Sequence, residues 1–172
     1  MFITVHAAAG ELLGTEITNP YFAFAAGVIL HFILDIIPHG DRELGKRFFG
    51  LLKKKVSEEE KIKSMAAYGL IDYIILVLFL LYSIKNFYFA KDDGVEWAIV
   101  GSIIPDLLVA VYVLTKSKYL KWFFDFHHWN HHLLIGNMQK DIPLKVGIAM
   151  QVIVFVILIL MLHRVNLMGA FF

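Results

Sequence analysis

Cysteine is absent from this chain of 172 residues, which excludes disulfides, thiolate nucleophiles and zinc sites built on cysteine. A large excess of charge is absent as well: the formal net charge is +1, and nothing in this balance suggests a nucleic-acid partner. The first 19 residues contain Glu11 and Glu16 but no lysine or arginine, so a secretory leader is not expected. Apolar residues, in contrast, are abundant. They make up 59% of the chain, where soluble domains have about 45–50%.

Long apolar stretches predict an all-α fold, namely a polytopic transmembrane helix bundle that forms a single domain. About 20 apolar residues in a helix cross the hydrocarbon core of a bilayer, which is roughly 30 Å thick. Four stretches have this character: residues 20–37, 64–84, 95–115 and 146–163. A short helix over residues 2–16 is expected to fold back against the first of them, which gives four to five membrane helices.

Capping residues agree with the limits of the first span. Asn19 and Pro20 place a capping side chain before a first-turn proline, as is common where a helix begins. Pro38 should close this span, because proline disfavours helical backbone at the residue before it.

Basic residues predict the orientation in the membrane. The connection 39–63 contains eight lysines and arginines, and the connection 116–145 contains five. The positive-inside rule therefore predicts that both lie on the cytoplasmic side of a prokaryotic plasma membrane. The stretch 42–56 is typical of a basic interfacial helix that binds anionic lipid head groups, although a solvated charged loop explains it equally well.

Ionisable residues of the spans converge at one depth in this topology. Asp35 and His31 are four residues apart and share a helix face near the cytoplasmic end of the first span. Asp72 and Asp106 fall in the cytoplasmic half of the membrane or near its middle, and four histidines lie within residues 127–132 of the second cytoplasmic connection. Because charge is expensive in lipid, such residues indicate a functional site.

Imidazole and carboxylate groups are the ligands that zinc, manganese and iron prefer, so the sequence predicts a site for one or two divalent ions, with zinc favoured. We expect direct metal binding from His31, Asp35, Asp106, His128 and His132. The other candidate ligands are His6, His39, Asp41 and His131. Candidates for a catalytic role are Asp35, Asp72 and His127.

Three segments resemble motifs of a known family: His6-Ala-Ala-Ala-Gly10, the stretch from His31-Phe-Ile-Leu-Asp35 to Pro38-His39-Gly-Asp41, and Ile104-Pro105-Asp106. They are similar to those of bacterial membrane-bound metal-dependent hydrolases, the inner-membrane group that includes the LexA-binding type. The Thr-His-Ser segment typical of that family does not occur here. The resemblance implies a metal-dependent hydrolase.

Three functions are compatible with these features. The first is a metal-dependent hydrolase that acts on a phosphoester or a lipid at the cytoplasmic membrane face. The second is a di-iron oxygenase, because His128, His131 and His132 match the His-x-x-His-His box of membrane desaturases. The third is a metal transporter or a membrane scaffold. A transporter is less favoured, because a transport path needs polar residues along its whole length and the outer half of the spans has few.

Overall fold

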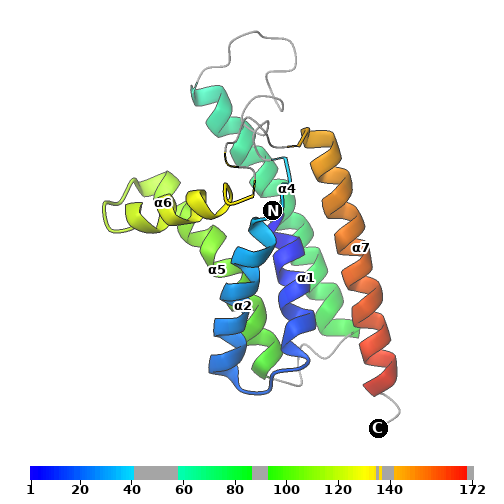
Figure 1. Cartoon of the computed structure of the whole chain (residues 1–172). Helices are drawn as coiled ribbons and strands as arrows, with labels where there is room; N and C mark the ends of the chain where they lie inside the picture. Colours follow the sequence, from blue (N-terminus) through cyan, green and yellow to red (C-terminus); the bar gives the residue numbers. More distant parts are fainter. Residues whose placement is uncertain (41–57, 87–92, 135, 137–141, 170–172) are drawn as a thin grey trace.

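The computed structural model describes residues 1–40, 58–86, 93–134, 136 and 142–169, which contain six helices and no strand (Figure 1). The all-α prediction is therefore confirmed for this part of the chain. Asp41 and the basic stretch 42–56 lie outside the described residues. The helices are α1 (Ile3–Gly14), α2 (Pro20–Asp35), α4 (Glu58–Asn86), α5 (Asp93–Thr115), α6 (Lys121–Asn130) and α7 (Leu144–Gly169).

Three described helices are long and apolar enough to cross a membrane, fewer than the four to five that the sequence predicted. They are α4, α5 and α7, and large apolar side chains such as Leu78 and Leu160 remain exposed on their outer faces. The difference arises at α2, which has 16 residues and so extends about 24 Å. Asn19 caps its first turn as predicted, but the helix ends at Asp35, three residues before Pro38.

Small residues let α1, α2 and α5 pack closely. A Cβ atom at Gly101 of α5 would collide with the backbone carbonyl of Phe24 in α2, and one at Gly27 of α2 would collide with the carbonyl of Ala98 in α5. Such contacts between backbones are the usual way in which helices associate in lipid, where the hydrophobic effect supplies no attraction between them. They fix α5 beside α2 and so set the distance between their polar residues.

The buried histidines and aspartates gather toward one end of the bundle. The C-terminal ends of α2 and α5 lie at this end, together with the first residues of α1, α4 and α7, while the short helix α6 runs across the bundle nearby (Figure 1). Both lysine-rich connections, 39–63 and 116–145, therefore attach at the end where these residues gather.

Candidate metal centre

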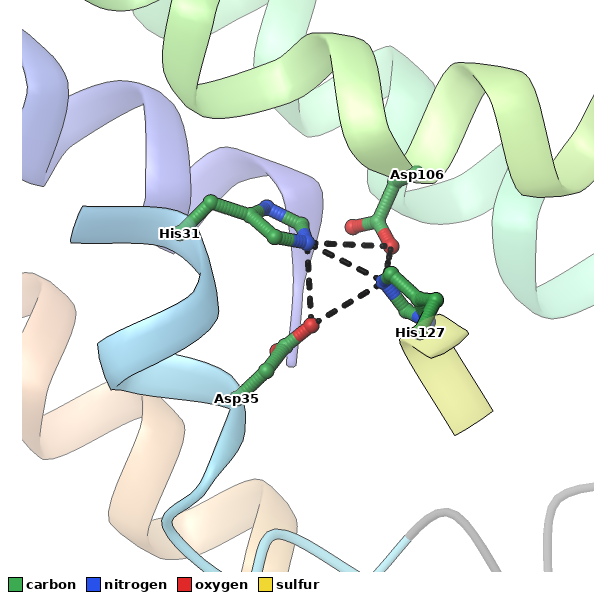
Figure 2. A group of neighbouring side chains, drawn as sticks. All are labelled: His31, Asp35, Asp106 and His127. Carbon is green, nitrogen blue, oxygen red and sulfur yellow. Dashed lines mark hydrogen bonds and ion pairs between the residues drawn. The ribbon is translucent and has the colours of Figure 1, made fainter. Parts of the chain in front are cut away.

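Four side chains from three helices converge near this end of the bundle (Figure 2). His31 and Asp35 come from α2, Asp106 from α5 and His127 from α6, and one ligand atom of each lies within 4.8 Å of the others. His31, Asp35 and His127 are buried, and the Asp106 side chain is partly exposed. Two imidazoles and two carboxylates are a suitable ligand set for a divalent transition metal. This group could therefore hold a metal ion.

The ring of His31 is fixed by a backbone carbonyl. Its Nδ1 donates a hydrogen bond of 2.8 Å to the carbonyl oxygen of Ser102 on α5. Pro105 interrupts the backbone ladder of α5 at this level, because it has no amide hydrogen to donate. With the proton on Nδ1, the neutral ring presents the lone pair of Nε2 to the cluster. Metal-binding histidines are commonly oriented in this way by a second partner.

Asp35 lies at the middle of the histidines. Its Oδ2 atom is 3.0 Å from Nε2 of His31, 3.2 Å from Nε2 of His127 and 3.1 Å from Nε2 of His131. This buried oxygen accepts no well-directed hydrogen bond from the described residues, although three imidazole nitrogens are so near. The Nε2 atoms of His31 and His127 are themselves only 3.1 Å apart. The carboxylate oxygen and the imidazole nitrogens thus lie close together, an arrangement that a cation would stabilise.

His6 lies behind the cluster. It comes from α1 and is fully buried, and its ring stacks on that of His31 with centroids 4.1 Å apart. Its Nε2 is 3.1 Å from Oδ1 of Asp35 and 4.0 Å from Oδ2 of Asp106. The shorter contact allows His6 to orient the Asp35 carboxylate. The folding back of α1, which the sequence predicted, brings His6 to the depth of His31.

The connection between α5 and α7 contributes one face of α6. His127 and its neighbour one turn later, His131, both face Asp35. His128 and His132 point away from it: their rings pair with each other at 4.4 Å, and His132 Nδ1 donates to the His128 carbonyl. The structure thus brings His127 and His131 together at Asp35. The sequence led us to expect His128 and His132 as direct ligands, and these two rings do not reach the cluster.

Asn130 explains why this face of α6 is turned inward. It lies three residues after His127, is buried, and donates a hydrogen bond of 2.8 Å to the carbonyl of Phe32 on α2. The aromatic ring of Phe32 also packs against the rings of Phe123, Phe126 and His127. One polar anchor and a small aromatic cluster therefore set the rotation of α6 about its axis.

The carboxylates strongly favour positive charge on His127. Burial by itself would lower the pKa of His127, but Asp106 and Asp35 outweigh it and raise the pKa to about 9. Asp106 Oδ1 is 3.4 Å from Nε2 of this ring. Burial lowers the pKa of His131, against the attraction of Asp35. The pKa of His128 is lowered as well, by burial and by the neighbouring histidines.

A second group of possible ligands adjoins the first. It consists of Asp35, His39 and His131, whose ligand atoms also lie within 4.8 Å of one another. Asp35 belongs to both groups, so one carboxylate lies between two histidine-rich positions.

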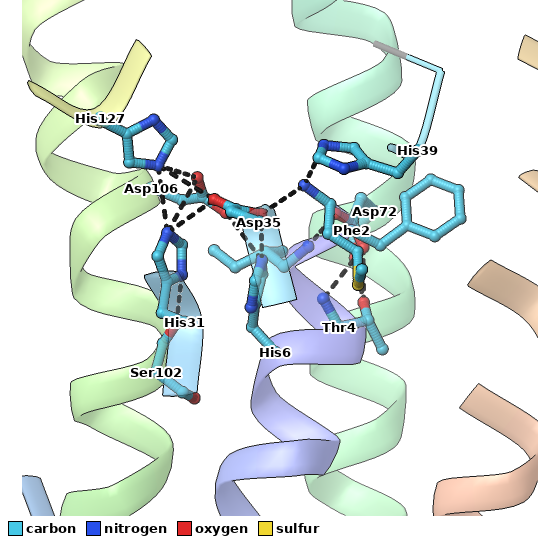
Figure 3. A network of polar contacts seen from close by, with 12 residues as sticks. Phe2, Thr4, His6, His31, Asp35, His39, Asp72, Ser102, Asp106 and His127 are labelled. Carbon is cyan, nitrogen blue, oxygen red and sulfur yellow. Dashed lines mark hydrogen bonds and ion pairs between the residues drawn. The ribbon is translucent and has the colours of Figure 1, made fainter. Parts of the chain in front are cut away.

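Asp72 occupies a different place, at the N-terminus of α1 (Figure 3). Its carboxylate accepts hydrogen bonds from the backbone amides of Ile3 and Thr4, at 2.6 and 3.3 Å, and from the Thr4 hydroxyl at 2.6 Å. These contacts satisfy amides that the first turn of a helix leaves without partners. Asp72 is not part of either ligand group, and its predicted catalytic role stays a prediction.

Like Asn130, Ser102 and Gln151 support the site and were not among the sequence candidates. Ser102 acts through its backbone carbonyl, which no side-chain pattern reveals. Gln151 of α7 donates to the carbonyl of His39 at 3.2 Å and is fully buried. As the single amide in the apolar stretch 146–163, Gln151 carried a signal that could have marked it.

Comparison of the chain with protein-family models, with curated proteins and with solved structures gave no match. The geometry of the polar cluster is consequently the basis for the function proposed below.

Proposed function

We propose that this protein is an integral-membrane, metal-dependent hydrolase whose metal ion is bound by His31, Asp35, Asp106 and His127. The observation that carries the proposal is the convergence on one buried carboxylate oxygen of three imidazole nitrogens within 3.2 Å. Burial of so many polar groups in an apolar bundle is costly unless they coordinate an ion or pair with one another.

The ligand chemistry supports zinc first, and manganese or iron next. In such a site a divalent ion would act as a Lewis acid and lower the pKa of a bound water. The protein's own residues orient the ligands: the Ser102 carbonyl fixes the ring of His31, and His6 contacts the Asp35 carboxylate.

Exposure of the ligands indicates where a substrate would approach. The side chain of Asp106 is 24% exposed and that of His131 is 16% exposed, whereas His31 and Asp35 are inaccessible. Metal enzymes keep an open coordination position for water or substrate, and this side offers it. The adjoining connections carry eight and five basic residues, which suit an anionic phosphoester or lipid head group.

The same basic residues support a cytoplasmic position for the site. Because both lysine-rich connections attach at the cluster's end of the bundle, the positive-inside rule assigns that end to the cytoplasmic face of a prokaryotic plasma membrane. We place α1 and α2 within the membrane as well, packed against α5. Anionic lipids are then the immediate neighbours of the site.

Elemental analysis combined with an activity screen tests this proposal. The full chain is purified in detergent without chelators, its metals are quantified, and it is assayed against phosphomonoesters, phosphodiesters and phospholipids. We expect at least about one zinc, manganese or iron ion per chain, and metal-dependent release of phosphate or of a lipid product. A chain that contains no such metal after reloading would overturn the proposal.

Neighbouring histidines of α6 provide a matched control. His127→Ala should lose the metal and the activity, and His128→Ala should retain both, because only the first ring faces Asp35. The opposite result would favour the His-x-x-His-His box and hence a di-iron oxygenase. That alternative has less support, because of the three histidines in the box only His131 faces Asp35, while the rings of His128 and His132 pair with each other.

A further inference from the structure

We infer that the site is binuclear: Asp35, His39 and His131 bind a second divalent cation, and the Asp35 carboxylate bridges the two ions. This inference rests on the proposed metal-dependent function. The inference assigns His131 to a different ion from the one that His127 binds, although the two histidines are one helical turn apart and both face Asp35. The two ligand groups share one residue, Asp35.

His39 is already oriented for this role. Its Nδ1 lies 2.6 Å from the carbonyl oxygen of Ile37, so Nδ1 carries the proton and Nε2 presents a lone pair. The backbone that carries the ring is held against α7: the Gln151 amide donates to the His39 carbonyl, and a Cβ at Gly147 would collide with that same oxygen. Gly40, with φ of +85°, adopts a backbone conformation that favours glycine.

His131 is the other histidine of this second ligand group. Its Nε2 is 3.1 Å from Oδ2 of Asp35, and its ring centroid is 5.0 Å from that of His39. The position between them also attracts positive charge, because the amino nitrogen of Met1 lies 2.9 Å from Asp35 Oδ1 and 2.7 Å from His39 Nε2. A divalent cation would displace this amino group and satisfy the same oxygen and nitrogen lone pairs with a higher charge.

Asp35 has the geometry of a bridge. Oδ2 faces His31 and His127 at 3.0 and 3.2 Å, and it also faces His131 at 3.1 Å. Oδ1 lies 2.9 Å from the Met1 nitrogen, the atom that also contacts His39. Binuclear hydrolases hold two ions roughly 3.5–4 Å apart, so that one activates water and both stabilise the attacking and leaving oxygens. Together with the basic connections, two ions at this position favour phosphoesters as substrates, because their transition state distributes charge over several oxygens.

Metal counting with a matched pair of variants tests the second position. The full chain, His131→Ala and His132→Ala are purified alike, loaded with Mn²⁺, and measured for bound manganese and by electron paramagnetic resonance. We expect about two ions per chain and an exchange-coupled signal for the parent chain and for His132→Ala. His131→Ala should retain about one ion and give the six-line signal of isolated Mn²⁺.

A second variant guards against a folding effect. His39→Ala changes the other histidine of the group, on a different segment, and should give the same loss of one ion and of the coupled signal. Elution as a single detergent-solubilised species shows that each variant folds. One ion in the parent chain, or two coupled ions in both His131→Ala and His39→Ala, would overturn the second site and leave the proposed function standing. No ion in the parent chain would overturn both.

Discussion

The raised pKa of His127 predicts how metal affinity depends on pH. Metal ions bind the neutral imidazole, so the proton that Asp106 and Asp35 hold on His127 must leave when the ion enters. With a pKa of about 9, roughly one molecule in a hundred has a neutral His127 at pH 7. The apparent affinity at pH 7 is then about 100-fold, or about 3 kcal/mol, below its value with the proton removed.

The sign follows from the same equilibrium. As pH rises from 7 to 9 the affinity should increase about tenfold per unit, and above pH 9 it should level off, because His127 is then neutral before the metal arrives. Competition with a chelator of known affinity measures the slope. Titration calorimetry in buffers of different ionisation enthalpy measures the proton, and we expect about one released per metal ion at pH 7.

His128→Ala serves as the control, since this ring lies on the other face of α6 and should leave the slope unchanged. A metal affinity that stays constant between pH 7 and pH 9 would refute the reasoning, because it would show that the two carboxylates do not hold a proton on His127.

Three further predictions concern the bundle and its supports. Gly27→Ala should lower the thermal unfolding temperature in detergent, with a cost of about 1–3 kcal/mol for overpacking, while Gly69→Ala, where a Cβ meets nothing within 4 Å, should not. Asp72→Ala should cost about 1–2 kcal/mol through loss of the α1 cap, yet keep its bound metal; loss of activity without loss of stability would instead establish a catalytic role. Gln151→Leu should weaken binding of the second ion by about 10- to 100-fold, the usual effect of losing a partner that supports a ligand. Bound manganese is measured over a range of manganese concentrations, and a binding curve identical to that of the parent chain would count against a supporting role for Gln151.

Local signals in the sequence identified much of the fold. Apolar stretches identified α4, α5 and α7, and Asn19 with Pro20 marked the start of α2. The end of α2 was misjudged, because Ile36 and Ile37 continue the apolar run although the helix has already ended at Asp35. Hydropathy reports which residues avoid water, and it does not report where the helical hydrogen bonds stop.

The candidate site was predictable where ligands share a helix, and not where two equivalent faces compete. His31 and Asp35 follow from their spacing of four residues. The run of histidines offered two pairs with the same spacing, and the choice between them depends on Asn130 reaching a carbonyl of α2. That contact joins residues 98 positions apart in the chain, so local periodicity does not contain it.

The position of Asp35 along the chain has a consequence for biosynthesis. His6 and His31, which contact its two oxygens, both precede it in the sequence, whereas Asp106, His127 and His131 follow much later. If α1 and α2 lie in the membrane as we propose, these two earlier imidazoles are available to share a proton with Asp35 when it enters the lipid. The hairpin would then insert with its acid compensated, and a metal ion bound by His127 could be captured only after α6 has been synthesised and has docked.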